Sequence, residues 1–92
     1  MKFDKEDVVA VMCNSGEFVG RFIELGTSFV SLRNPRMIVQ TQDGVGFAHG
    51  ICITGEADVG RVDIFRESVS FVTKANIEVE KAYVQATSGI II

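Results

Sequence analysis

The chain has 92 residues, a length that predicts one domain near the lower limit for folding without disulfides or metals. Hydrophobic residues make up 47% of the chain and charged residues 23%, proportions that exclude an intrinsically disordered protein. The net charge of −3 excludes a global basic field, so any nucleic-acid binding would need a local group of basic residues.

The first half of the chain predicts three strands joined by tight turns. An apolar run at residues 8–13 forms the first strand. The second spans residues 17–24, and Gly20 in its interior predicts a bulge or a sharp bend. A long third strand follows at 29–42. Its Pro35 has no N–H group for a ladder bond, so a bulge or an open edge is expected there.

The second half predicts two further strands around an inserted loop. The Asp-Gly pair at 43–44 lies between two strand-like runs, which is typical of a tight hairpin. A fourth strand is expected from residue 47 to 55, with a loop inserted at 55–61, after which the strand resumes at 62–65. The fifth strand is expected at 67–73.

The tail, residues 75–92, allows two interpretations. Its IEVE segment alternates apolar and charged residues with the period of a strand, whereas Asn76 could cap a helix that Gly89 ends. We expect extended structure here. The final GIII is too apolar to lie alone in water, so we expect it to be packed or paired.

Together these elements predict an all-β fold. Five antiparallel strands of this length bury one face only if the sheet curls, which gives a small, strongly bent, five-stranded antiparallel barrel. The single domain then covers residues 1–92, with its core at 8–74 and the tail at 75–92.

Two segments carry a resemblance to a known family. GEFVGRFIELGTSFVSL is similar to the first motif of the Sm and LSm proteins, and VDIFRESVSFV resembles the second motif. The residues that match the glycine and apolar positions of these motifs are Gly20, Phe22, Leu25, Phe29, Leu32, Val62, Ile64, Val69 and Phe71. The similarity covers roughly residues 8–74 and is to a divergent Sm-like branch of phage and other bacterial contexts.

The resemblance implies an SH3-like barrel that forms a ring with copies of itself. In such rings the fourth strand of one subunit pairs with the fifth strand of the next, and roughly five to seven copies close the circle. The exposure of strand edges independently favours a ring, because a half-open barrel has unpaired edges that a closed head-to-tail ring covers.

The resemblance also implies two loops that face the pore and contact single-stranded RNA. The candidate residues are Thr27, Ser28 and Phe29 in one loop and Phe65 and Arg66 in the other. The phenylalanines would stack on unpaired bases, and Arg66 would bond to base edges or phosphate. Alternatively, both phenylalanines belong to the core, and the adjacent Glu67 neutralises Arg66.

Three positions depart from the family pattern. Gly26 stands where the family has an acidic residue, Ser28 where a residue stacks on a base, and Val30 where an asparagine reads uracil. The family's Arg-Gly pair is represented by Arg66-Glu67. These departures favour a ring that has lost RNA binding.

Arg33 and Arg36 are a further candidate basic site on the third strand. Repeated around a ring, they would form a basic circle despite the acidic total. Alternatively, they keep an edge strand soluble, as edge charges commonly do.

Other motifs predict no enzyme, metal or cofactor. His49 is the one histidine and has no cluster of ligands at metal-binding spacing, and no nucleophile or phosphate-loop pattern occurs. Cys13 and Cys52 lack CxxC spacing and predict buried, reduced thiols. With a charged start and no long apolar run, the chain is expected to be cytoplasmic, with no membrane partner.

The sequence therefore supports two functional hypotheses. The first is a ring-forming, single-stranded RNA-binding module. The second is a non-enzymatic protein-interaction or phage assembly ring, in which the tail docks a protein partner.

Overall fold

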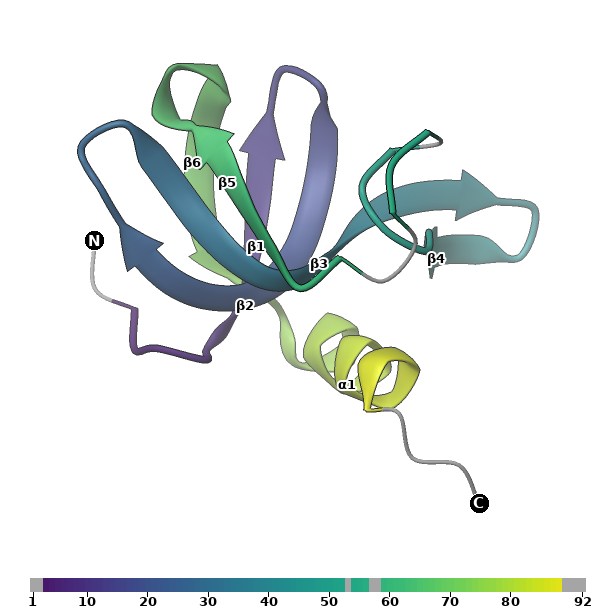
Figure 1. The fold of residues 1–92 in the computed structure, drawn as a ribbon. Coiled ribbons are helices and arrows are strands. Elements are labelled where there is room, and N and C mark those ends of the chain that lie inside the picture. Colours follow the sequence, from purple (N-terminus) through teal and green to yellow (C-terminus); the bar gives the residue numbers. More distant parts are fainter. Residues whose placement is uncertain (1–2, 53, 57–58, 89–92) are drawn as a thin grey trace.

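The computed structural model describes residues 3–52, 54–56 and 59–88 (Figure 1). Its elements follow the chain as β1 (Val8–Cys13), β2 (Gly16–Leu25), β3 (Phe29–Thr41), β4 (Gly44–Phe47), β5 (Arg61–Phe65), the 3₁₀ turn η1 (Arg66–Ser68), β6 (Val69–Lys74) and α1 (Ile77–Thr87). The expected all-β chain is therefore mostly β, with one helix at its end.

The strands form one antiparallel path in the order β4-β3-β2-β1-β6, and β5 pairs with the first part of β3. Because η1 links β5 directly to β6, the two ends of the sheet lie near each other (Figure 1). Yet within the described residues β5 pairs with β3 and β6 with β1, and no ladder joins β5 to β6. The antiparallel, strongly bent sheet is therefore confirmed, but it is not closed into the predicted small barrel.

A bulge in β3 produces much of the curl. Gly20 of β2 lies opposite two residues, Asn34 and Pro35, because the register shifts between Val19 and Arg21. Asn34 has a φ of 51°, and a Cβ atom on Gly20 would come within 3.1 Å of the Pro35 Cα. Any larger residue at this position would have to push the Pro35 backbone away, so glycine suits this close approach. The bends predicted at Gly20 and Pro35 are confirmed as one feature.

The strand alternation produces two separate cores. Val9 and Val11 of β1 point into the concave side of the sheet, together with Phe22, Val30 and Leu32. Val8, one position out of phase, packs on the opposite side, against Val19 and Tyr83. The sheet is thus buried on both faces along β1 and β2, and α1 covers the second face.

The tail is helical over residues 77–87, so the predicted extended structure is wrong. The Asn76 side chain accepts a hydrogen bond from the Val79 N–H at 2.9 Å, which caps the helix. The inward-facing residues Val79, Tyr83 and Thr87 follow with helical spacing. The expectation for the final GIII lies outside the described residues.

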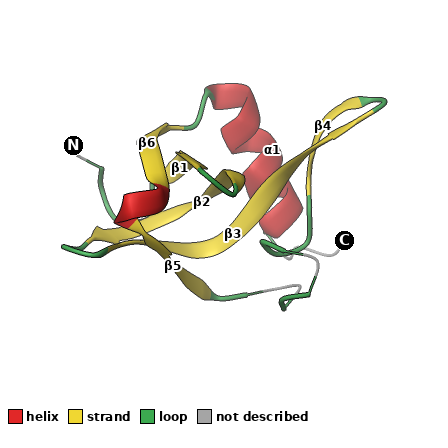
Figure 2. Cartoon of the chain, turned by 90° about the horizontal axis from the view of Figure 1, so that it is seen from above, coloured by secondary structure: helices red, strands yellow, loops and turns green. Residues whose placement is uncertain are grey.

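The predicted fourth strand at 47–55 is also wrong. The hairpin at 43–44 is confirmed, but β4 ends at Phe47, and the described residues from 48 to 60 form bends and turns. Cys52 is exposed in this segment, unlike the buried Cys13. Figure 2 shows β3 crossing the molecule and its hairpin with β4 projecting beyond the other strands.

Candidate nucleic-acid interface

Two turns meet at one end of the sheet and form a joined surface, here called the loop pair: the β2–β3 turn at residues 26–28 and η1. The Arg66 N–H donates to the Ser28 carbonyl at 2.9 Å, and the Arg66 Nη1 donates to the Gly26 carbonyl at 3.0 Å. The Gly26 N–H closes the turn on the Phe29 carbonyl at 2.8 Å. Arg66 therefore fixes the two turns relative to each other.

An exposed aromatic pair lies beside these turns. Phe29 and Phe65 are opposite each other in the β3–β5 ladder, with ring centroids 5.2 Å apart and planes tilted by 34°. They remain 38% and 65% exposed, so neither belongs to the core. Their outer faces offer apolar, aromatic surface to solvent, which suits stacking on an unpaired base.

A small cavity of about 230 Å³ lies against the aromatic pair, lined in part by Thr27, Ser28, Phe29 and Asp63. The buried Ser31 hydroxyl donates to the Asp63 carboxylate at 2.7 Å, and Arg61 Nε donates to the same oxygen at 3.0 Å. These two hydrogen bonds, that from Ser31 foremost, lower the pKa of the Asp63 carboxyl below its usual value. Because Arg61 also lines the cavity, a carboxylate acceptor and a guanidinium donor lie side by side there, a pair suited to the edge of a base.

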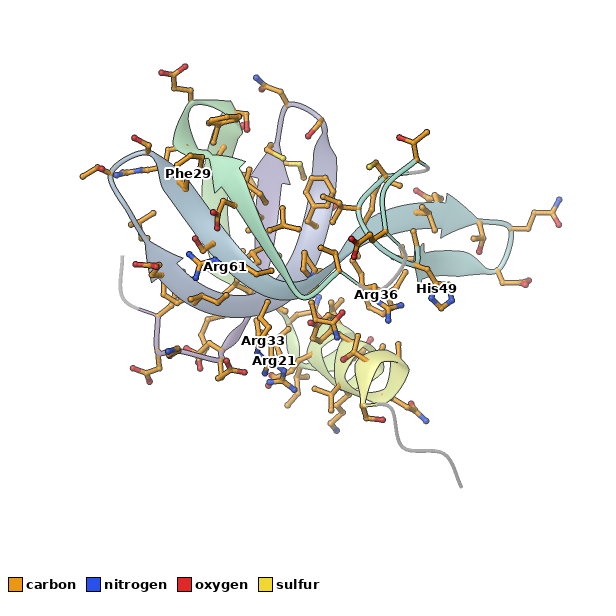
Figure 3. The ribbon with its side chains drawn as sticks, viewed as in Figure 1. Arg21, Phe29, Arg33, Arg36, His49 and Arg61 are labelled. Atoms are coloured by element: carbon orange, nitrogen blue, oxygen red, sulfur yellow. The ribbon has the colours of Figure 1, made fainter. Side chains whose placement is uncertain are left out.

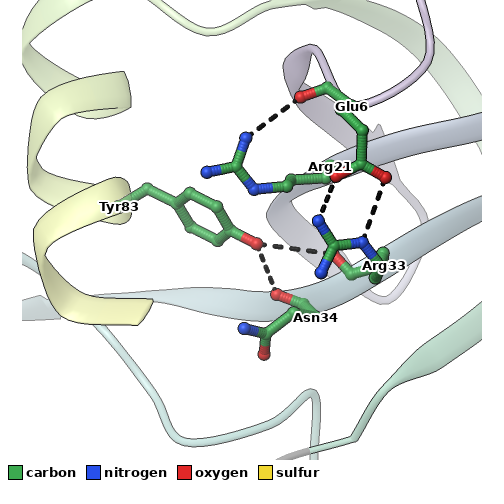
Figure 4. A network of polar contacts seen from close by, with 5 residues as sticks. All are labelled: Glu6, Arg21, Arg33, Asn34 and Tyr83. Atoms are coloured by element: carbon green, nitrogen blue, oxygen red, sulfur yellow. Dashed lines mark hydrogen bonds and ion pairs between the residues drawn. The ribbon is translucent and has the colours of Figure 1, made fainter. Parts of the chain in front are cut away.

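Arg33 lies away from the loop pair, at the other end of the β3–β5 ladder, where it faces Arg61. Its guanidinium donates from Nε and Nη2 to the two oxygens of the Glu6 carboxylate (Figure 4). This pairing lowers the pKa of Glu6 and raises that of Arg33. Arg21 donates to the Glu6 backbone carbonyl at 3.1 Å, so two arginines hold the N-terminal segment.

Arg36 is buried just beyond the bulge, opposite Val19 of β2 and before the part of β3 that pairs with β4. Its side chain lies beside His49, with Nη1 3.4 Å from the imidazole Nδ1 (Figure 3). His49 itself is exposed and belongs to the segment after β4, not to a strand. The structure therefore brings the loop residues together and places Arg33 and Arg36 in a different region.

Sequence reasoning missed three residues of these surfaces. Arg61 and Asp63 are two positions apart on β5, a spacing that places them on one face of a strand and was the available signal. Tyr83 of α1 donates a hydrogen bond to the Asn34 carbonyl at 2.7 Å, and no local pattern predicts this long-range contact.

Within the described ranges, no helix has the length and apolar character needed to cross a bilayer, and no group of three or more His, Cys, Asp or Glu side chains is placed to hold a metal ion. Comparison of the chain with protein-family models, with curated proteins and with solved structures finds no match in any of the three.

Proposed function

We propose that the chain assembles into an Sm-like ring through the edges of β5 and β6, and that the ring binds single-stranded RNA at the loop pair. In the described part of the chain, β5 pairs on one side with β3 and β6 on one side with β1. Each therefore offers a second edge, and an unpaired edge is a template for another strand. Pairing β5 of one copy with β6 of the next gives a head-to-tail contact that a ring closes.

Exposed apolar side chains along these edges support the assembly. Phe71 on β6 is 54% exposed, and Leu25 at the end of β2 is 36% exposed. A cavity of about 210 Å³ runs beside β6, with Leu25 and Phe71 among its lining residues. Covering these side chains removes apolar surface from water, and roughly five to seven copies would complete the circle.

The exposed Phe29–Phe65 pair is the observation that carries the RNA proposal. Aromatic stacking contributes about 1–3 kcal/mol per base and tolerates any base. Beside the pair, the Arg66 Nη1 donates to the Gly26 carbonyl. Its Nε and Nη2 donate to no side chain of the described residues, which leaves them for a base edge or phosphate. In a ring, each copy would contribute one such set of groups.

Fluorescence anisotropy with labelled U-rich and A-rich RNA tests the proposal. We expect Phe65→Ala to weaken RNA binding by roughly tenfold, because it removes a stacking surface. Arg66→Ala should also weaken binding without changing assembly. Val45→Ala alters an equally exposed apolar residue on the distant hairpin and should leave affinity unchanged. Wild-type affinity in both loop variants would refute the assignment.

A second candidate is a protein-interaction or assembly ring that binds no RNA. A cavity of about 400 Å³ lies between the sheet and the start of α1, with Val19, Ile38 and Val79 in its wall. Ile77, 67% exposed, begins the helix at this point. If this candidate is correct, a nuclease-treated pull-down recovers a partner that Ile77→Glu loses, and RNA binding is absent. Equal capture by the variant would reject this surface.

A further inference from the structure

A second surface, separate from the loop pair, surrounds the β3 bulge. An open cavity of about 820 Å³, here called the bulge cavity, is lined by three arginines and a histidine: Arg33, Arg36, His49 and Arg61. Small-molecule sites commonly have volumes in this range. These side chains come from β3, from the segment after β4 and from the start of β5, so the fold gathers them from three places (Figure 3).

The bulge cavity is distant from the aromatic pair. The Arg33–Arg61 pair lies four positions along the β3–β5 ladder from the Phe29–Phe65 pair. At strand spacing this is roughly 13 Å, too far for one base or phosphate to contact both. A ligand of the bulge cavity is therefore a different ligand, or a different part of a longer one.

The carboxylates paired with Arg33 and Arg61 hold these two arginines in place. Arg33 donates to Glu6 through both its Nε and its Nη2. Arg61 donates to Asp63 through its Nε and to Glu24 through its Nη2. None of these three carboxylates is among the described residues that line the cavity. The Nη1 groups of Arg33 and Arg61 donate to no described atom, so they remain as donors for a ligand.

His49 adds a directed donor. Arginine has no acceptor atom, so in the 3.4 Å contact the Nη1 of Arg36 donates and the His49 Nδ1 accepts. An imidazole that accepts at Nδ1 carries its proton on Nε2, which can donate to a second group. Arg36, only 6% exposed, supplies a positive guanidinium held in place within the fold.

We propose that the bulge cavity binds a phosphate group, which Arg36 and the Nε2–H of His49 contact, with Arg33 and Arg61 at its sides. Planar guanidinium forks match phosphate oxygens in geometry and charge. The C-terminal end of α1 also borders the cavity, through Ala86, and its partial negative charge repels anions. The phosphate therefore lies on the β3 side, and apolar wall near Ala86 and Ile23 is left for a ribose or base.

Calorimetric titration with uridine 5′-monophosphate, inorganic phosphate and uridine tests this proposal on the whole chain. We expect the two phosphate compounds to bind and uridine not to bind. His49→Ala changes an exposed side chain and should fold normally, while weakening nucleotide binding about tenfold. Phe65→Ala is the matched control and should leave nucleotide binding unchanged. No heat from either phosphate compound, or wild-type nucleotide affinity in His49→Ala, would overturn the proposal.

Two further arms distinguish the source of the phosphate and separate this site from the loop pair. If His49→Ala also weakens binding of a short RNA, the bulge cavity takes a phosphate of the strand. If only nucleotide binding is weakened, the ligand is a free nucleotide. Nucleotide binding by a protein that binds no RNA refutes RNA binding at the loop pair and supports the bulge cavity. RNA binding that needs Phe65, in a protein that binds neither phosphate nor nucleotide, supports the loop pair and refutes the bulge cavity.

Discussion

Gly20 is the residue on which the curvature of the sheet most depends. A Cβ atom there would lie 3.1 Å from the Cα of Pro35, which is backbone and cannot rotate away. We expect Gly20→Ala to lower the free energy of unfolding by about 1–3 kcal/mol, as overpacking does. Gly46→Ala is the control, because its Cβ would meet nothing nearer than 3.8 Å. Equal denaturation midpoints for the two variants would contradict this account of the bend.

Glu6 gives the fold a dependence on pH. The pKa of its carboxyl lies below the ordinary value of 4.5 in the folded chain, because Arg33 donates hydrogen bonds to the ionised form. The pairing therefore stabilises the fold above pH 4.5 and is lost as the pH falls through the folded-state pKa. We expect Glu6→Gln to be less stable than wild type at neutral pH and equally stable in strong acid. Urea denaturation across this range measures the difference, and a constant difference would count against the pairing.

The neighbours of some candidate site residues could be predicted from the sequence, whereas those of others could not. The loop residues Ser28, Phe29, Phe65 and Arg66 are neighbours as expected, because a strand pairing and a short turn bring them together. Arg33 and Arg36 are three positions apart on one strand, but the bulge at Asn34 and Pro35 separates them. Their different surroundings depend on that bulge and on contacts with Glu6 and His49, which no local pattern specifies.

At the scale of elements, β1, β2 and β3 follow the prediction closely because alternation and glycine turns determine them locally. The apolar residues after Phe47 were predicted to be a strand, since an apolar run alone does not distinguish strand from packed loop. For the tail, four alternating residues were too short to identify the period, and the burial of Tyr83 against β3 decided the outcome.

The docking of α1 can be tested at Tyr83. Its hydroxyl donates to the Asn34 carbonyl at 2.7 Å, in the bulge (Figure 4). We expect Tyr83→Phe to lower the free energy of unfolding by about 1 kcal/mol while circular dichroism keeps its helical signal. Val84→Ala changes a neighbouring, partly exposed helix residue and should have a smaller effect. Unaltered stability in Tyr83→Phe would mean that the hydroxyl does not hold the helix to the bulge.

For the whole molecule, the open sheet is the feature that leads to assembly. A closed barrel has no free strand edges. In the described structure, this open sheet leaves β5 and β6 each with one edge at which another strand can pair. Phe71, on the β6 edge, is 54% exposed in the single chain. Both the RNA-binding ring and the protein-interaction ring depend on pairing there.

The mass of the protein in solution, measured by light scattering, tests this central claim most directly. One chain has a mass of 10.0 kDa, and we expect a single species of roughly 50–70 kDa that persists on dilution. Phe71→Glu, which places a charge at the β6 edge, should shift the mass toward that of one chain while the fold is retained. A wild-type mass of 10.0 kDa at every concentration would contradict the ring and the two functions proposed for it.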